Sequence, residues 1–385
     1  MSKCGLCQSE STEFLSLGKQ PMANKYPKEK DFKKEEFFDV KVHFCPFCKN
    51  IQVSPQVSRE TMFVDYYYLS SVNKALVDHY TEFAHTLKDA KFVVDIGSND
   101  GISLKPLKEI GVVALGVEPS KNVSKIANDA GLQTLNDFFN ADSAKYIEEH
   151  YGKPDVITGL SMFSHLQDPH TFLEDVKNLL DDDGKFVVEV EYNLEILRWG
   201  AFERFYLDRI FYFSATSFET LFKKHGMVLV DAEVTSVHGG SLRVTAKKSG
   251  EQSQRTLDLL DYERRFLTED TVTEFANEAK LNVYALKRKL EEYKHDGLKV
   301  AAYGCPARTA TITNFGDIGR DLIKYIVDDS PLKQGRFSPG KHIPIVPCAQ
   351  DVQPDIWVIF AFEYFEEIKK KIDGRFLFPI PPREV

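Results

Sequence analysis

One segment, Phe92–Glu118, constrains the fold of this chain more than any other. It reads as an apolar strand, a turn bracketed by Gly97 and Gly101, a helix, and a second strand that ends in an acid. An uninterrupted apolar run such as Phe92–Val94 is typical of a strand buried on both faces of a parallel sheet. The glycines allow backbone geometry that side chains forbid, and they leave N–H groups exposed where the helix begins. The segment therefore predicts a βαβ unit with a ligand-binding turn.

The acidic residues around this turn indicate its ligand. A dinucleotide site has a glycine where the backbone approaches the pyrophosphate, but this chain has Asn99 at that position. Asp95 and Asp100 would repel a diphosphate, whereas they suit the positive sulfonium and ammonium groups of S-adenosylmethionine (SAM). Glu118 lies at the next strand end, where a carboxylate can accept the hydroxyl groups of a ribose. An ordinary βαβ unit with a glycine-containing turn is the alternative interpretation.

A third strand end adds to this prediction. The stretch Leu135–Phe138 resembles the corresponding strand end of SAM-dependent methyltransferases. The resemblance implies that Asp137 binds the adenine amine and that Phe138 covers the adenine face. The predicted SAM-binding residues are Asp95, Gly97, Asn99, Asp100, Gly101, Glu118, Pro119, Asp137 and Phe138.

Four cysteines near the N-terminus form two C-x2-C pairs. Cys4 and Cys7 make the first pair, and Cys45 and Cys48 make the second. Four thiolates at this spacing can close a tetrahedral zinc site with no open coordination position, which predicts a structural metal. Disulfides are the alternative, and a reducing compartment disfavours them.

Length and charge limit the function classes. A chain of 385 residues predicts two or three domains. The net charge of −9 argues against a nucleic-acid-binding protein, which would show a clustered basic face. The N-terminal sequence has no signal-peptide pattern, and no apolar run is long enough to span a bilayer. We therefore expect a cytoplasmic protein without a nucleic-acid or membrane partner.

The order of strand-like and helix-like segments predicts an α/β architecture in three parts. A small zinc module with a tyrosine-rich connector is expected over residues 1–75, followed by a Rossmann-like SAM-binding methyltransferase domain over 76–247. The polar stretch Lys248–Gln254 reads as a link. A second Rossmann-like domain, which would bind a nucleotide-sugar, is expected over 248–385.

A second glycine-containing turn, Tyr303–Thr309, follows a strand of the C-terminal part. Free N–H groups at the next helix, together with Arg308 and Thr309, could hold a phosphate. A plain strand–turn–helix corner with a surface loop is the alternative. The predicted substrate-binding residues are Tyr303, Gly304, Arg308, Thr309, Asp329, Lys333 and Gln334.

The order of motifs resembles the bacterial nucleotide-sugar C-methyltransferases over nearly the whole chain. The matching segments are the four cysteines, DYYYLSS, VDIGSNDG with GVEPS, GLSMFSH, FYFSATSFETLFKKHG, VHGGSLRV, YGCPARTATITN and DDSPLKQGRFSPGKHIPI. The resemblance implies a zinc module, a SAM domain and a C-terminal domain that helps to hold a nucleotide diphosphate-sugar. It also implies methylation of the carbon beside the ketone of a 4-keto-6-deoxy sugar, after that carbon has lost a proton.

The presumed catalytic stretch departs from the family pattern. The family usually has Tyr-His-Glu-His where this chain has Tyr206–Arg209, so the presumed histidine base has become an arginine. A guanidinium stays protonated and cannot accept a proton, so Arg209 is left with an electrostatic role, such as stabilising an enediolate or binding a carboxylate. The resemblance also implies that Tyr68 fixes the substrate. The remaining base candidates are His165, Asp208, Tyr206 and His238.

Arg209 leaves three functions open. The first is C-methylation of a nucleotide-linked keto-deoxysugar. The second is O- or N-methylation of a nucleotide-linked or acidic sugar, which needs a weaker base than carbon-acid chemistry does. The third is a protein that binds SAM and a nucleotide-sugar without turnover. For the catalytic stretch itself, the alternative interpretation is that Asp208 and Arg209 form a surface ion pair.

Overall fold

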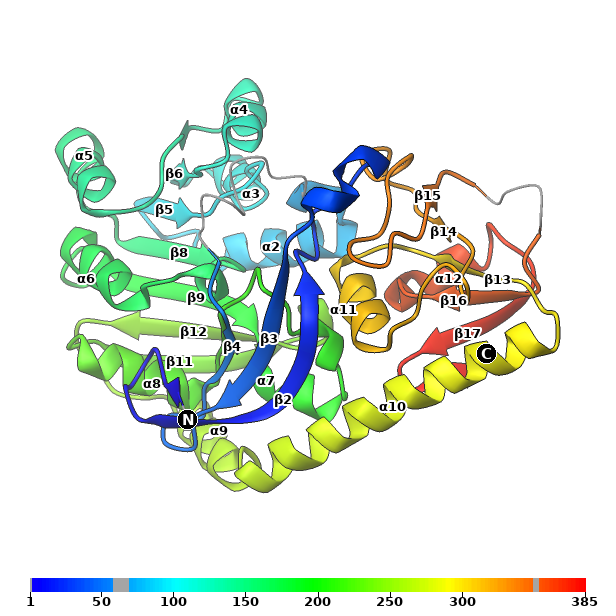
Figure 1. Ribbon diagram of the computed structural model, residues 1–385. Helices are drawn as coiled ribbons and strands as arrows, with labels where there is room; N and C mark the ends of the chain where they lie inside the picture. The colour runs from blue at the N-terminus through cyan, green and yellow to red at the C-terminus, as the bar shows by residue number, and fades with distance from the viewer. Residues whose placement is uncertain (1, 58–68, 349–352) are drawn as a thin grey trace.

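The computed structural model describes residues 2–57, 69–348 and 353–385 (Figure 1). These residues form three β-sheets, with five strands in the N-terminal sheet, seven in the central sheet and six in the C-terminal sheet. Figure 1 shows the long strands of the N-terminal sheet between the other two sheets. The predicted α/β fold class is confirmed, with a Rossmann-like arrangement around the central sheet.

The N-terminal sheet is completed by a strand from the middle of the chain. Its order is β1-β2-β3-β4-β10, and Phe211 and Tyr212 of β10 pair with Gln52 and Ile51 of β4. The cysteine-bearing part is therefore joined to the segment that directly follows Arg209. The elements are β1 Ser2–Lys3, β2 Glu10–Pro21, the 3-10 helix η1 Glu29–Lys34, β3 Phe37–Phe44, β4 Ile51–Ser54 and β10 Phe211–Tyr212.

The central sheet is parallel from β5 to β9 and ends in two antiparallel strands. Its order is β11-β12-β9-β8-β5-β6-β7. The strands that follow β5 in the chain first extend to one side of it, as β6 and β7, and then to the other side, as β8 and β9, so the strand order reverses at β5. Ligands of such sheets bind beyond the carboxyl ends of the strands at this point. The strands are β5 Phe92–Ile96, β6 Val113–Val117, β7 Thr134–Leu135, β8 Val156–Leu160, β9 Lys185–Glu191, β11 Val228–Thr235 and β12 Ser241–Lys247.

Helices and short 3-10 turns connect these strands. Asn140 caps α5 and Ser214 caps α8 through reciprocal side-chain and backbone bonds, which satisfy N–H groups that the helix leaves unpaired. The elements are η2 Ser70–Val72, α2 Lys74–His85, α3 Leu104–Glu109, α4 Lys121–Asp129, α5 Ala141–Tyr151, η3 Phe163–His165, α6 Pro169–Leu179, α7 Asn193–Arg198, η4 Phe202–Arg204, α8 Ala215–Lys224 and η5 Val237–Gly239.

The C-terminal sheet has the order β15-β14-β13-β16-β17-β18, and only its last pairing is antiparallel. The long helix α10 runs from the central part of the molecule along the C-terminal part (Figure 1). The elements are α9 Gln254–Phe266, α10 Glu269–His295, β13 Val300–Tyr303, α11 Ala307–Phe315, β14 Ile326–Val327, β15 Ile345–Val346, β16 Ile356–Ile359, η6 Phe362–Tyr364, α12 Phe365–Ile368, β17 Arg375–Pro379 and β18 Pro382–Glu384.

Helix α9, which follows the predicted link, packs against β11 and α8 of the central part. Its Glu263 is fully buried and accepts hydrogen bonds from the Tyr192 hydroxyl at 2.7 Å and from the Ala215 N–H at 2.7 Å. Residues 254–266 thus pack with the central sheet, although the predicted C-terminal range begins at 248. The division of the chain into domains over residues 1–75, 76–247 and 248–385 stays a prediction.

One apolar core runs through all three parts. The rings of Phe14 in β2 and Phe275 in α10 both pack against Phe205, at centroid distances of 6.2 and 5.8 Å. The segment that carries the candidate catalytic residues is therefore anchored where the three parts meet. Within the described residues, no helix combines the length and hydropathy needed to cross a membrane.

Candidate active site

The four N-terminal cysteines gather as a zinc site. Their sulfur atoms all lie within 4.8 Å of one another, with Cys4 and Cys48 3.6 Å apart and Cys7 and Cys45 3.5 Å apart. A tetrahedron of thiolates about 2.3 Å from zinc has edges of about 3.8 Å, so this donor set fits the metal. The separations are far from a disulfide bond of about 2.05 Å. This cluster confirms the predicted structural zinc site.

The first cysteine pair packs against the catalytic part of the chain. A Cβ on Gly5 would lie 2.7 Å from the ring of Phe211, which leaves room only for glycine at position 5. Phe211 belongs to β10, directly after the candidate catalytic stretch. A zinc ion held by the four cysteines would therefore stabilise the surface on which that stretch rests.

The predicted SAM turn has the geometry that its glycines allow. Gly97 and Gly101 have φ angles of +73° and +85°. A Cβ on Gly97 would meet the Met162 side chain at 2.8 Å, and one on Gly101 would meet Leu132 at 2.4 Å. Both glycines are thus required by backbone conformation and by packing. The contact at Met162 places the turn beside the loop that carries His165.

Two acids organise this turn. The Glu118 carboxylate accepts the Asn99 N–H at 3.1 Å and the Ser120 N–H at 2.8 Å, while only 5% of the residue is exposed. Asp95 accepts the Thr158 hydroxyl at 2.6 Å and the Ser103 hydroxyl. Burial raises the pKa of Asp95 to about 6. In this structure Asp95 thus holds the strand end together, and its direct contact with SAM stays a prediction.

The other predicted SAM residues lie at neighbouring strand ends. The Asn136 side chain donates to the backbone oxygens of Glu118 and Pro119 at 2.9 and 3.0 Å, which ties the loop after β7 to the loop after β6. Asp137 is exposed and accepts the N–H of the half-buried Phe138. The carboxyl ends of β5, β6 and β7 thereby form one edge.

The segment before α2 also contacts this edge. The Ser70 N–H donates to the Asn99 side chain at 3.0 Å, and the Ser71 N–H and hydroxyl donate to Asp100. This segment belongs to the DYYYLSS motif. Tyr68, the predicted substrate-fixing residue of that motif, lies outside the described residues.

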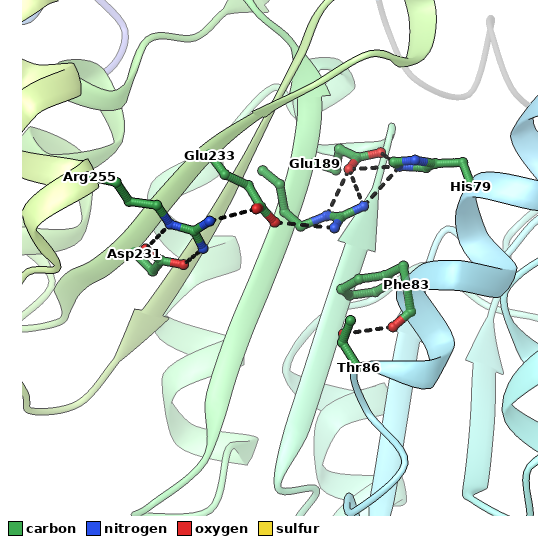
Figure 2. Close-up of polar contacts among 8 residues, drawn as sticks. His79, Phe83, Thr86, Glu189, Asp231, Glu233 and Arg255 are labelled. Atoms are coloured by element: carbon green, nitrogen blue, oxygen red, sulfur yellow. Dashed lines mark hydrogen bonds and ion pairs between the residues drawn. The ribbon is translucent and has the colours of Figure 1, made fainter.

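A network of ionic contacts holds α2 on the central sheet (Figure 2). Glu189 in β9 is 1% exposed and contacts His79 of α2 at 2.8 Å. Arg243 in β12 donates to Glu189 at 2.8 Å and lies over the Phe83 ring of α2 at 4.3 Å. Figure 2 also shows that the network of ion pairs continues through Glu233 to Arg255 and Asp231. These contacts fix the helix that directly follows the segment in contact with the predicted SAM turn.

Arg209 forms a buried ion pair, but not with its sequence neighbour. Its guanidinium lies 2.7 Å from Glu191 at the end of β9, and its side chain is only 17% exposed. The expectation of a surface ion pair between Asp208 and Arg209 is therefore wrong. Burial alone would raise the pKa of Glu191, but Arg209 and Arg204 together lower it to about 2.

Asp208 is buried with one oxygen left available. Its Oδ2 accepts the side-chain N–H of Asn24 at 2.6 Å, and its Oδ1 has no hydrogen-bond partner within the described parts of the chain. Burial raises the pKa of Asp208, and the Asn24 hydrogen bond and Arg209 oppose this shift. A carboxylate with a raised pKa and an unpaired oxygen has the properties of a general base.

Two further candidates lie close to Asp208. Tyr206 is two residues before it in the sequence, and His165 contacts its backbone. The Nδ1 of His165 contacts the backbone oxygen of Asp208, which can only accept, so this nitrogen carries the proton. Burial and Arg209 lower the pKa of His165 to about 4, so the ring is neutral near pH 7. Burial raises the pKa of Tyr206 to about 12, and Arg209 lies over its ring at 5.2 Å. Tyr206 is thus a proton donor rather than a base.

His238 contacts the arginine that, with Arg209, pairs with Glu191. Its φ angle is +53°, and its backbone oxygen accepts a hydrogen bond from Arg204. Burial lowers the pKa of His238, while Glu191 opposes that shift. The fold thus brings the four base candidates, His165, Tyr206, Asp208 and His238, into one region. They differ in the direction of their pKa shifts and in the groups that they contact.

The C-terminal turn is built as the sequence predicts, with one exception in accessibility. Gly304 has a φ angle of +83°, and a Cβ there would meet Ala361 at 2.4 Å. Thr309, by contrast, is fully buried in α11, so its hydroxyl is not exposed for a phosphate. Around the turn, the Tyr303 hydroxyl donates to Asp329 at 2.8 Å, Lys333 donates to the Cys305 oxygen at 3.1 Å, and Gln334 donates to the Asp328 oxygen at 2.9 Å.

An ionic contact joins this turn to the catalytic stretch. Glu363, after β16, lies 2.6 Å from Arg308 and 3.7 Å from Arg204. Sequence reasoning missed Glu191, Arg204, Glu363 and Asn24. Glu191 could have been found by the rule that identified Glu118, an acid at the end of a buried strand. The others carry no local signal, because their partners come from distant parts of the chain.

Comparison with known protein families finds three consecutive matches. They are a zinc binding domain over residues 4–63, a methyltransferase domain over 68–232, and a C-methyltransferase C-terminal domain over 236–381.

Individual relatives differ in how much of the chain they cover. The C-methyltransferase NovU from Streptomyces niveus is 30% identical over 100% of this chain and 97% of its own length. A ubiquinone biosynthesis O-methyltransferase from Maricaulis maris is 25% identical over 31% of this chain and 48% of its own length. Among solved structures, magnesium protoporphyrin IX methyltransferase from Synechocystis PCC 6803 with bound SAM matches 46% of this chain and 79% of its own, with 14% identity and a TM-score of 0.35.

Proposed function

Because the chain belongs to the SAM-dependent C-methyltransferases that join a zinc binding domain, a methyltransferase domain and a C-methyltransferase C-terminal domain, we propose that its acceptor is a nucleotide-linked keto-deoxysugar, methylated beside the ketone. Bound SAM supplies an electrophilic methyl group. The acceptor carbon must first lose a proton, and its negative charge spreads onto the ketone oxygen. The chain must therefore provide a base and a donor.

Asp208 is the proposed base. Its buried, unpaired Oδ1 is the single observation that carries this assignment. The carboxylate would take the proton from the carbon beside the ketone, and the electron pair left on that carbon would form the bond to the methyl group, while the bond between that methyl group and the sulfur of the donor would break and leave a neutral thioether. Tyr206, which keeps its proton, and the Arg209 side chain would stabilise the oxygen that gains charge. His165 would hold the Asp208 backbone through its protonated Nδ1.

The C-terminal turn is the proposed site of the nucleotide diphosphate. Support comes from its glycine conformation and from the gathering of Tyr303, Lys333 and Gln334 at the ends of β13 and β14. Arg308 would release its ion pair with Glu363 and bind the phosphates instead.

The alternative of an acidic sugar requires that the Arg209 guanidinium is free to bind a carboxylate of the substrate. Glu191 now neutralises that guanidinium at 2.7 Å, so an acidic substituent would have to compete with a buried carboxylate. This observation favours a neutral keto-sugar over an acidic one.

A direct assay tests the proposal. The protein is incubated with SAM and nucleotide-linked 4-keto-6-deoxy sugars in deuterated water, and NMR follows deuterium beside the ketone and a new C-methyl group. Wild type and the exposed control Asp129→Asn should both exchange and methylate, whereas Asp208→Asn should lose at least about a hundredfold, the usual contribution of a general base. A methyl group on oxygen or nitrogen would establish the second function, and SAM binding without consumption would establish the third.

A further inference from the structure

The segment Met22–Pro27 of the N-terminal part is held by the C-terminal domain. The Tyr26 hydroxyl donates to the Cys305 oxygen at 2.8 Å, and the Tyr26 oxygen accepts from Arg336 at 3.1 Å. The Lys333 ammonium lies 5.2 Å from the centre of the Tyr26 ring. These contacts attach the segment to the C-terminal domain close to the catalytic stretch.

Asn24 is the side chain that this segment presents. Its Nδ2 donates to the Oδ2 of Asp208 at 2.6 Å. Asn24 is exposed, whereas Asp208 is only 7% exposed, so the amide lies on the solvent side of the carboxylate. The hydrogen bond holds one oxygen of Asp208 and leaves Oδ1 without a partner among the described residues.

Several charged or titratable groups surround this carboxylate. Arg209 favours the ionised form of Asp208, and His165 contacts the Asp208 backbone oxygen. The charge of Asp208 contributes to the raised pKa of Tyr206 and of Tyr26. Arg209 is already paired with Glu191. Within the described residues, the amide of Asn24 is therefore the side-chain donor that hydrogen-bonds the carboxylate itself.

We propose that Asn24, supplied by the zinc-bearing N-terminal part, is a positioning residue that orients the Asp208 carboxylate and stabilises its ionised form. This inference rests on the proposed role of Asp208 as the base. Asn24 acts through Asp208 and does not itself move a proton. The N-terminal part thereby completes the active site in addition to holding zinc.

The test compares variants within one short segment. Asn24→Ala removes the donor, Asn24→Gln keeps an amide on a longer side chain, and the exposed neighbour Lys25→Ala is the matched control. A hydrogen bond to a charged group favours the ionised form of that group, so Asn24→Ala should move the acidic limb of the pH–exchange profile upward by about one pH unit or more. Asn24→Gln should recover part of the shift, and Lys25→Ala should not move it.

A second measurement does not depend on turnover. Carbon-13 NMR of protein labelled at aspartate carboxyls, with Asp208→Asn to assign the signal, reports the pKa of Asp208 directly. Zinc content and the urea unfolding midpoint confirm that each variant is folded. A higher pKa in folded Asn24→Ala supports the inference, and an unchanged pKa overturns it. If wild type shows no exchange with any sugar, the proposed function fails while this titration still decides the role of Asn24.

Discussion

The guanidinium of Arg209, in the loop before β10, lies 2.7 Å from the carboxylate of Glu191, the last residue of β9. The pair is buried against the Tyr206 ring. Arg209 replaces a presumed catalytic histidine, yet its charge is already balanced by an acid of the same chain. The replacement thus introduces an ionic cluster into the site without leaving an uncompensated cation.

Breaking this pair should destabilise the protein strongly. Glu191→Gln leaves Arg209 buried without its counter-charge, and removal of one partner of a buried pair costs about 3–5 kcal/mol. Urea unfolding of the purified protein measures the loss. The control is Asp129→Asn, which breaks an exposed pair with Lys125 and should change stability by less than about 1 kcal/mol. Equal midpoints for the two variants would contradict a buried Arg209.

Zinc content should depend on the clustered cysteines only. Cys45→Ser removes one thiolate, so the protein should lose stoichiometric zinc and unfold at a lower temperature. Elemental analysis and thermal unfolding provide the two readouts. Cys348→Ser is the control, because Cys348 is exposed and lies outside the cluster. Full metal retention in Cys45→Ser would rule out the four-thiolate site.

The SAM turn should not tolerate a side chain at its first glycine. Gly97→Ala meets the Met162 side chain at 2.8 Å in addition to the strain of a φ angle of +73°. We expect SAM affinity by calorimetry to fall at least about tenfold, because relief of the clash must move the turn or the His165 loop, and a loss of about 1.4 kcal/mol is already tenfold. Gly111→Ala has a similar φ of +83° but open space around it, so it should bind SAM as wild type does.

Stability should fall on mild acidification, and His165 should account for part of the loss. The pKa of His165 is about 4 in the folded protein and about 6.5 in an unfolded chain, so the unfolded state binds a proton that the folded state excludes. This contribution is complete above pH 6.5 and is lost as the pH falls toward 4, by up to about 3 kcal/mol. Urea unfolding at pH 7 and pH 4.5 should show a smaller difference for His165→Asn than for wild type. Identical pH dependence would contradict a half-buried imidazole that stays neutral.

Local motifs were predicted from the sequence with their geometry. The positive φ angles of Gly97 and Gly101, the acid at the end of β6, and the grouping of the four cysteines follow from a few neighbouring residues each. The strand beginning at Phe92 and the turn at Gly304 were also correctly placed. In each case hydrophobic pattern, glycine conformation or ligand spacing is enough to decide the outcome.

The arrangement of the catalytic groups could not be predicted in this way. Nothing near Arg209 in the sequence indicates Glu191 as its partner, and the sequence neighbour Asp208 was the wrong candidate. The pairing of β10 with β4 likewise joins two segments that look unrelated in the sequence.

The sequence by itself determined the zinc ligands, the cofactor turn and the family, because these depend on residue types at short and regular spacing. The tertiary structure decided which groups surround the presumed base. Asn24 and Asp208 are 184 residues apart in the chain, yet they are joined by a hydrogen bond of 2.6 Å. Such a contact forms only because burial of the shared apolar core offsets the entropy of bringing distant segments together, and that balance belongs to the whole fold rather than to either segment.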